Sequence, residues 1–284
     1  MILVTGAAGK TGRAAIAALA DRGKTVRALV HRSDQEQPMR DLGAHEVVTG
    51  DMADHATMAT AAHDVRAIYH ICPAVDPRET EIGRMAIHAA LDAGAERFVY
   101  HSVLHPQIEA LPHHLGKLRV EQLLIASGLA CTMLQPTVYM QNMLEVWEPI
   151  SRQGRYPVPY SIEAGLSMVH LGDVAECAVK ALTEAGHAGA TYELCGPEVL
   201  TAVQIAGALG RHLGRPVTAE AIPVEAWAER ALSSGMGDYQ VETLGTMFRY
   251  YGQHGLRGNS NVLEWLLGRR PTGLAGFLEE AAPK

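Results

Sequence analysis

Short apolar runs alternate with amphipathic segments through the first half of the chain. The apolar runs predict buried strands at 2–5, 25–30, 46–50, 66–71, 97–102 and 130–136. Apolar positions at helical spacing predict helices between most of these strands, at 10–23, 55–63, 79–94 and 113–127. Strand–helix alternation with short connections is typical of an α/β fold with a doubly wound parallel sheet, in which ligands bind at the carboxyl ends of the strands.

The pattern changes after about residue 155. Residues 154–161, which contain prolines and aromatic side chains, predict a loop. Residues 166–182 predict a short strand, a cap near Gly172 and Asp173, and then a helix.

The remaining segments predict a smaller and mostly helical region. They comprise a strand over 190–196, a helix over 201–214 capped by Thr201, and a mostly helical last stretch with a final short helix opened by Pro271 and Thr272. We therefore expect an α/β domain at 1–155 and a smaller region at 156–284, some segments of which pack back on the sheet.

Three glycines follow the first predicted strand, in the stretch "VTGAAGKTG". Gly6, Gly9 and Gly12 are spaced three apart and open the first predicted helix. A triphosphate-binding loop requires four residues between its glycine and the Gly-Lys pair, whereas only two separate Gly6 from Gly9. A strand, a glycine turn and a helix N-terminus instead form a pyrophosphate site, since backbone N–H groups and the helix dipole favour an anion. The alternative is a glycine-rich turn that binds no ligand.

The end of the second predicted strand bears on the choice of dinucleotide. An NAD site usually carries an acid there, which accepts hydrogen bonds from the adenosine ribose. This chain has Arg32 in "LVHRS", and a guanidinium can bind the 2′-phosphate of NADP. Lys10 adds a second positive charge. We expect NADP (NADPH) as the cofactor, although Asp34, close by in sequence, leaves NAD open.

Motifs along nearly the whole chain resemble those of the NmrA-like family of atypical short-chain dehydrogenase/reductases. The resemblance rests on the glycine stretch, "LVHRS", "GDM" (50–52), "YHSVLHP" (100–106), "HHLGKLRVEQLLIASGL" (113–129), "LQPTVYMQN" (134–142) and the later "VHLGDVAECAVKAL" and "LLGRRPT". It implies a Rossmann fold with a smaller C-terminal substrate lid. The family includes NAD(P)H-dependent quinone, dye and aryl-ether reductases, as well as proteins that bind the dinucleotide without turnover.

The resemblance also implies a set of cofactor-binding residues. These are Gly6, Gly9, Lys10, Thr11 and Gly12 for the pyrophosphate, Arg32 for the adenosine phosphate, Asp51 and Met52 for the adenine, Ile71, Cys72 and Pro73 for the nicotinamide half, Lys117 for the nicotinamide ribose, and Pro136 and Thr137 for the carboxamide side.

The expected catalytic residues depart from the familiar pattern of the family. Relatives with the usual pair have a Tyr four residues before the Lys, and this chain has His113 before Lys117. Ser102, which ends the fifth predicted strand, stands where dehydrogenases keep a hydroxyl that polarises the substrate. An unperturbed His is a suitable acid at neutral pH, but a neighbouring Lys disfavours its charged form. His113 therefore either supplies a proton or only caps the helix or contacts the cofactor. A further departure is Gln135, where the family often has Arg.

Other polar and aromatic residues have simpler interpretations. His114, one residue after His113, is expected to face solvent. We expect no metal site, because His101, His105, His113 and His114 lack a Cys or carboxylate at ligand spacing. Tyr139 and Asn142 either line the substrate mouth or pack in the core at a helix start.

Composition narrows the classes of function. The net charge of −7 removes the usual driving force for binding nucleic acid, and no apolar run reaches the length of a membrane span. We expect no secretory leader, and the four scattered cysteines predict free thiols in a cytoplasmic protein. Assembly into a homo-oligomer is left open. We expect an NADPH-dependent reductase of a small aromatic or conjugated carbonyl, quinone or imine; the alternative is a non-catalytic NADP(H)-binding redox sensor that acts through a protein partner.

Overall fold

A seven-stranded sheet dominates the computed structural model, which describes residues 1–281. Its strands are β1 (Ile2–Val4), β2 (Val26–Val30), β3 (Glu46–Thr49), β4 (Ala67–His70), β5 (Arg97–His101), β6 (Cys131–Pro136) and β8 (Thr191–Leu194). They lie in the order β3-β2-β1-β4-β5-β6-β8, and the pairs from β3 through β6 are parallel. The order reverses direction between β1 and β4, which is where a doubly wound sheet opens a ligand crevice.

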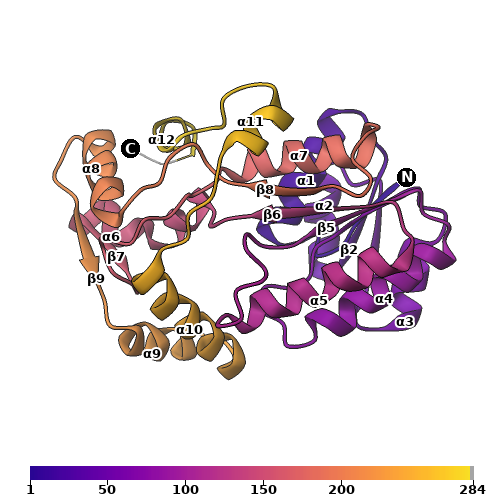
Figure 1. Cartoon of the computed structure of the whole chain (residues 1–284), viewed down its shortest axis with the longest axis horizontal. Helices are drawn as coiled ribbons and strands as arrows, with labels where there is room; N and C mark the ends of the chain where they lie inside the picture. Colours follow the sequence, from indigo (N-terminus) through magenta and orange to yellow (C-terminus); the bar gives the residue numbers. More distant parts are fainter. Residues whose placement is uncertain (282–284) are drawn as a thin grey trace. The chain divides into compact units, whose positions relative to one another are not determined.

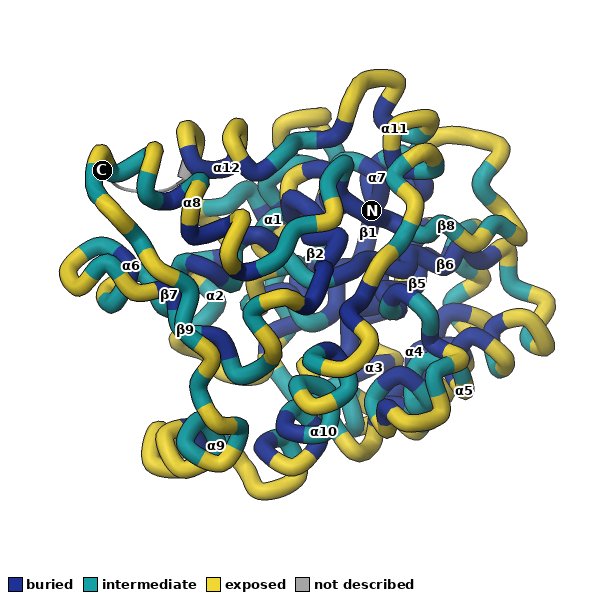
Figure 2. The backbone as a smooth tube through the Cα atoms, turned by 60° about the vertical axis from the view of Figure 1, so that its left-hand side comes forward, coloured by how far each residue is buried: buried dark blue, intermediate teal, exposed yellow. Residues whose placement is uncertain are grey.

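The central strands are buried on both faces, which explains their continuous apolar runs. Every residue of β1, β4 and β6 is buried, and Figure 2 shows β1 and β6 in dark blue. One core cluster joins Leu3 of β1, Ile68 of β4 and Phe98 of β5 to apolar residues of the neighbouring helices. The predicted doubly wound parallel sheet is thus confirmed, with strand ends within about two residues of expectation.

Helices cover both faces of the sheet (Figure 1). They are α1 (Lys10–Asp21), the 3-10 turn η1 (Ser33–Gln35), α2 (Glu36–Asp41), α3 (His55–Ala62), α4 (Glu79–Asp92), α5 (Pro112–Ser127) and α7 (Leu171–Thr183). Helices α3, α4 and α5 lie on one side, and α1 and α7 on the other. An ion pair between Arg22, which ends α1, and Glu176 of α7 lies on this second side.

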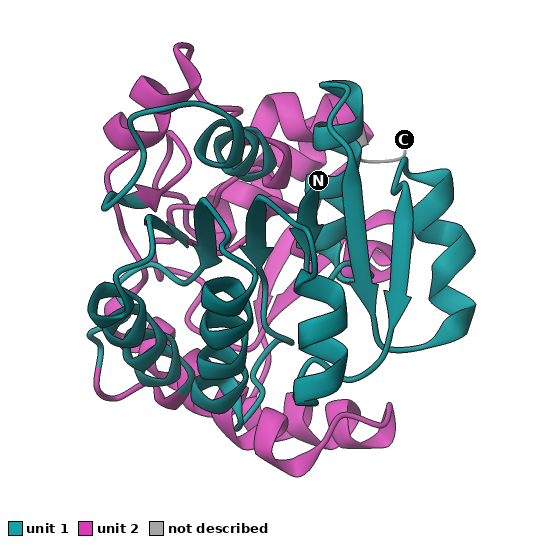
Figure 3. Ribbon diagram, turned by 90° about the vertical axis from the view of Figure 1, so that its right-hand side faces the viewer, with its two compact units in different colours: residues 1–108, 113–135, 174–192 teal, residues 109–112, 136–173, 193–284 magenta. Residues whose placement is uncertain are grey.

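The chain divides into two compact units (Figure 3). Unit 1 comprises residues 1–108, 113–135 and 174–192, and unit 2 comprises residues 109–112, 136–173 and 193–284. The segment 174–192 thus returns to the unit that contains the glycine turn.

Unit 2 contains a second, two-stranded parallel sheet and most of the C-terminal helices. Its elements are η2 (Met140–Val146), α6 (Trp147–Gln153), β7 (Arg155–Val158), α8 (Ala202–Leu213), β9 (Thr218–Ala221), α9 (Val224–Ser233), α10 (Asp238–His254), α11 (Asn261–Leu267) and α12 (Leu274–Ala281). The helical C-terminal region is confirmed, and the cap at Thr201 forms a capping box with Gln204. The loop expected at 154–161 was wrong in its first half, because β7 pairs with β9. Pro157 is compatible with this strand because both strands of a two-stranded sheet are edges.

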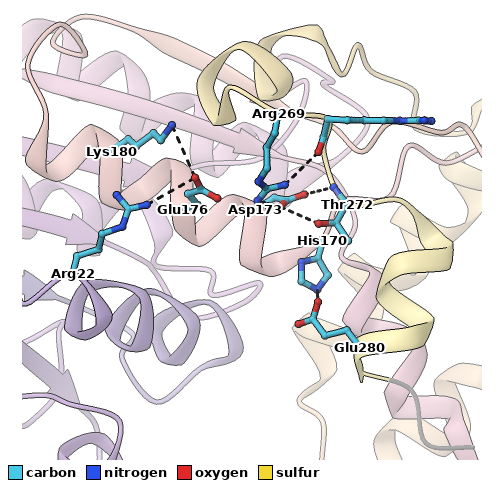
Figure 4. Close-up of polar contacts among 9 residues, drawn as sticks. Arg22, His170, Asp173, Glu176, Lys180, Arg269, Thr272 and Glu280 are labelled. Carbon is cyan, nitrogen blue, oxygen red and sulfur yellow. Dashed lines mark hydrogen bonds and ion pairs between the residues drawn. The ribbon is translucent and has the colours of Figure 1, made fainter.

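Asp173 has a different role from the helix cap that its position suggested. Helix α7 begins at Leu171, and the strand expected before it is reduced to isolated bridges. The Asp173 carboxylate is 1% exposed and accepts hydrogen bonds from Arg269 Nη2 (2.8 Å), Thr272 N (2.6 Å) and Thr272 Oγ1 (3.1 Å), as Figure 4 shows. Asp173 therefore anchors the segment that leads into α12.

Two features are absent from residues 1–281. No helix in this range is long and apolar enough to cross a membrane. No group of three or more His, Cys, Asp or Glu side chains in the same range is arranged to hold a metal ion.

Candidate functional site

The glycine turn (residues 6–12) requires two of its glycines for its own packing. Gly6 has a φ of +58°, and a Cβ placed on it would lie 2.5 Å from the carbonyl oxygen of Ile71. A Cβ on Gly12 would lie 2.5 Å from the carbonyl oxygen of Gly6. A side chain at either position would push the turn away from β4 or from α1.

Gly9 is less crowded than Gly6 and Gly12, although a Cβ there would still make one tight contact. It is the N-cap of α1 with a φ of −72°, and the nearest atom to an added Cβ is the Gly6 carbonyl oxygen at 3.3 Å. No side chain caps the first turn of α1. Lys10 and Thr11 begin α1 at this point. A helix N-terminus without a side-chain cap leaves backbone N–H groups for an anion, which suits a pyrophosphate.

The carboxyl ends of β1 and β4 are locked together below this turn. The Thr5 hydroxyl accepts a hydrogen bond from Ile71 N (2.9 Å) and lies 3.0 Å from His70 Nδ1. Ile71 and Cys72 are buried, whereas Pro73 is exposed. Burial and the nearby Glu79 carboxylate raise the pKa of the Cys72 thiol far above its ordinary value, so this thiol is not a nucleophile.

Three residues expected at the adenosine end lie on loops after β2 and β3. Arg32 forms a two-pronged ion pair with Asp34, and both side chains are exposed. Asp51 accepts a hydrogen bond from Ala53 N (2.9 Å) and lies 3.6 Å from Arg78. Met52 is half-buried and packs against the core cluster of unit 1.

Close contact between α4 and α5 positions the expected catalytic lysine. Pro112 occupies the first position of α5, where its missing N–H costs nothing. A Cβ on Gly83 of α4 would lie 2.5 Å from a methyl group of Val120 on α5. The absence of a side chain at Gly83 therefore lets the two helices approach, which brings Lys117 of α5 to Glu79 of α4.

Lys117 is held by a buried carboxylate. Its Nζ donates to Glu79 Oε1 (3.1 Å) and to the carbonyl oxygen of His101 (3.1 Å), and the Lys117 and Glu79 side chains are only 16% and 7% exposed. The Tyr100 hydroxyl donates to the same Glu79 oxygen (2.7 Å), and the ammonium lies 5.3 Å from the centre of the Tyr100 ring. Sequence reasoning missed Glu79 and Tyr100, because no local motif links residues 38 positions apart.

His114 is buried, so the expectation that it faces solvent was wrong. Its Nδ1 donates to the carbonyl oxygen of His105 (3.0 Å), and its ring packs edge-on against His113 at 4.5 Å. Through this hydrogen bond the loop after β5 contacts the first turn of α5, and the contact shields His114 from water. Burial, then His114, then Lys117 lower the pKa of His113 to about 3, and burial lowers that of His114 to about 4. Both imidazoles are therefore neutral at pH 7.

Three buried polar atoms around this helix start have no partner among residues 1–281. They are Ser102 Oγ, His113 Nδ1 and His114 Nε2. Ser102 directly follows β5, next to the His101 carbonyl that Lys117 binds. A buried polar atom without a hydrogen bond costs about 1–3 kcal/mol, so a polar ligand that paired with these atoms would regain that free energy. The residues fit a dinucleotide and a polar substrate group on these grounds.

The expected contacts of the carboxamide side and the substrate mouth belong to unit 2. Pro136 ends β6, and Thr137 is 5% exposed with an Oγ1 that has no partner in the described part of the chain. Tyr139 forms a bridge with Val169, and Asn142 lies half-buried in η2.

The departure at Gln135 has a structural explanation within unit 1. Its Nε2 donates to Glu121 Oε1 (2.8 Å), and both side chains are buried. The amide therefore satisfies a buried carboxylate of α5.

A sheet whose order reverses beneath a glycine turn is the mark of the Rossmann-type α/β proteins. Within this class the chain belongs to the NmrA-like family, whose sequence profile matches residues 1–279.

Relatives with known names cover most of the chain. An NAD(P)H azoreductase from Xenophilus azovorans is 28% identical over 284 residues, 99% of this chain and 98% of that protein. A (4-alkanoyl-5-oxo-2,5-dihydrofuran-3-yl)methyl phosphate reductase from Streptomyces griseus is 36% identical over 229 residues, 80% of this chain and 78% of that protein. The crystal structure of the Escherichia coli NADPH-dependent quinone oxidoreductase QOR2 with NADPH has a TM-score of 0.85 at 26% identity, covering 98% of this chain and 99% of that one.

Proposed function

We propose that this chain is an NADPH-dependent oxidoreductase that reduces a small aromatic or conjugated carbonyl, quinone or imine. The observation that carries the proposal lies at the carboxyl end of β5: the half-buried Lys117 ammonium binds the His101 carbonyl, and the next residue, Ser102, has an Oγ without a partner in residues 1–281. The names of the relatives, an azoreductase, a furanyl phosphate reductase and a quinone oxidoreductase, support the same reaction class.

The chain's residues divide into cofactor-binding and chemical roles. The glycine turn and the N-terminus of α1 bind the pyrophosphate, and Arg32 binds the 2′-phosphate. Lys117 has three donor hydrogens, of which Glu79 and the His101 carbonyl take two, and the third binds the nicotinamide ribose. When bound, NADPH supplies a hydride to the substrate.

The substrate oxygen or nitrogen that gains charge is bound by Ser102 Oγ, and the proton reaches it through His113 and water. Because the pKa of His113 is lowered to about 3, its ring is neutral at pH 7. It relays a proton by donating the hydrogen of one ring nitrogen to the substrate while the other ring nitrogen takes a proton from water. A site without a strong acid favours a substrate whose reduced form is a weakly basic anion. A phenolate-like hydroquinone anion, with a pKa of about 10, meets this condition, and an alkoxide from a simple ketone does not.

The loss of NADPH absorbance with a panel of acceptors tests the proposal. We expect turnover with quinones and conjugated carbonyls and little with simple ketones. His113→Ala should lower kcat by up to roughly 10²-fold and leave the Kd for NADPH unchanged, while His113→Tyr should retain or raise activity. Full turnover by His113→Ala would show that His113 does not relay the proton.

A redox sensor that binds NADP(H) without turnover is the second candidate. The lowered pKa of His113, which stands at the position of the usual Tyr, favours it, because the neutral imidazole is a weak proton donor. NADPH binding by calorimetry, without oxidation by any acceptor in the panel, would support the sensor and refute the reductase.

A further inference from the structure

Lys117 and Glu79 form an ion pair without net charge at the carboxyl end of β5. The ammonium donates to Glu79 Oε1 at 3.1 Å, and the two side chains are 16% and 7% exposed. Water therefore screens either charge weakly, so each one acts over several ångströms on the groups around it. A third charge near the pair would feel mainly the difference between the ammonium and the carboxylate.

Both charges of the pair act on the residues that end β4. Cys72, which is expected beside the nicotinamide half of the cofactor, has a thiol whose pKa is raised by burial, raised further by Glu79 and lowered by Lys117. His70, the last residue of β4, shows the same opposition: burial lowers the pKa of its imidazole most, Glu79 raises it and Lys117 lowers it. The carboxylate thus offsets the ammonium at this edge of the sheet.

We propose that Glu79 is a positioning residue that balances the charge of Lys117, so that a positive nicotinamide ring can form beside the ammonium. The inference rests on the NADPH-dependent reduction proposed above. It assigns to Glu79 a task beyond holding the side chain of Lys117 in place.

The reason lies in where charge appears during reduction. Transfer of a hydride to the substrate leaves the nicotinamide ring, which is neutral in NADPH, with a positive charge, and the substrate then takes a proton through His113 and water. The ring is bonded directly to the ribose that Lys117 binds in this proposal. An ammonium without its carboxylate would therefore repel the oxidised ring and spare the reduced one. With Glu79 in place, most of this repulsion is cancelled.

A purely structural role for Glu79 has a different signature. A displaced Lys117 would weaken the binding of NADPH and of NADP⁺ by the same factor, because both forms carry the same ribose. A variant that is only partly folded raises both apparent Kd values equally as well. The ratio of the Kd for NADP⁺ to the Kd for NADPH therefore isolates the effect of charge, and its measurement requires no turnover.

Calorimetric titration of Glu79→Gln, Lys117→Met and the double variant with NADPH and NADP⁺ at pH 7 tests the proposal. Glu79→Gln leaves an unbalanced positive charge, so the ratio should rise roughly threefold to twentyfold. Lys117→Met leaves an unbalanced negative charge, so the ratio should fall by a comparable factor although both forms bind more weakly. The double variant leaves neither charge, and its ratio should return close to that of the wild type.

Glu81→Gln is the matched control. Glu81 lies in the same first turn of α4 as Glu79, but its side chain is exposed, so water and salt screen its charge. This variant makes the same change in the net charge of the protein, and its ratio should equal that of the wild type.

Three results would overturn the proposal. An unchanged ratio in Glu79→Gln would show that the carboxylate does not balance a charge felt by the ring. An equal rise in Glu81→Gln would assign the effect to the net charge of the protein. A wild-type chain that bound neither NADPH nor NADP⁺ would refute the proposed cofactor site and this inference with it. The expected ratios without turnover by the wild type would support the charge balance and refute only the reductase.

Discussion

Replacing Glu79 with Gln should destabilise the chain strongly, because it removes the carboxylate that two buried donors share. The shape of the side chain is kept and only its charge is lost. The Lys117 ammonium then keeps the His101 carbonyl as an acceptor, and the Tyr100 hydroxyl keeps a neutral one. The variant therefore tests the charge of the pair and not the packing of α4 against α5.

The burial of the pair sets the size of the effect. Breaking a buried ion pair by removing one partner costs about 3–5 kcal/mol, since the other charge is left uncompensated. This cost applies to Glu79 and Lys117, because their side chains are only 7% and 16% exposed. The loss is a large fraction of the roughly 5–15 kcal/mol by which a folded domain is stable.

A double-mutant cycle separates the pair from its surroundings. Lys117→Met should cost about as much as Glu79→Gln, and the double variant should cost less than the sum, because it leaves no unpaired charge. We expect a coupling of about 2–3 kcal/mol in the free energy of unfolding, from urea titration followed by circular dichroism. Glu81→Gln is the control, since Glu81 is an exposed acid of the same helical turn. It should change stability by less than about 1 kcal/mol and combine additively with Lys117→Met.

Additive losses from Glu79→Gln and Lys117→Met would refute the reasoning. So would a Glu79→Gln variant no less stable than Glu81→Gln. Either result would mean that water, and not Glu79, compensates the ammonium.

Three further predictions concern the glycine turn, the histidines and the helix crossing. Gly9→Ala should fold with a small loss of stability and weaken NADPH binding at least roughly tenfold by calorimetry, and unchanged affinity would exclude the turn as the phosphate site. Gly12→Ala should lose more than about 2 kcal/mol of stability, because its Cβ would meet backbone at 2.5 Å. In the unfolded chain His113 binds a proton below about pH 6.5, whereas in the folded chain it does so only near pH 3. The free energy of unfolding should therefore fall as the pH is lowered. His113→Gln should reduce the slope of that free energy against pH by about 1.4 kcal/mol per pH unit, measured by urea titrations between about pH 6 and 4. Gly83→Ala should cost about 1–3 kcal/mol and weaken NADPH binding, because a Cβ 2.5 Å from Val120 drives α5 away; full affinity would disconnect the crossing from the site.

Local patterns predicted the elements of unit 1 well, for a physical reason. Strands β1, β4 and β6 are buried on both faces, so their apolar runs are continuous and their ends are marked by turn residues. The glycine turn was predictable as well, because its spacing lies within one strand–helix junction.

Features that depend on distant residues were not predictable. β7 contains two prolines in or beside its span and becomes a strand only because β9 supplies a partner. The burial of His114 depends on the His105 carbonyl in the preceding loop. The role of Glu79 depends on how closely two helices pack, which no spacing within α4 or α5 reveals.

The Asp173 anchor has a consequence for the order of folding. Its partners Arg269 and Thr272 follow it by 96 and 99 residues, whereas every residue of unit 1 has been synthesised by residue 192. Unit 1 can therefore close during translation. Unit 2 cannot bury Asp173 until residue 272 has left the ribosome, because an unpaired carboxylate resists burial. Until then Asp173 stays in solvent, and any slowing of synthesis over the last helices lengthens the interval in which unit 2 is incomplete.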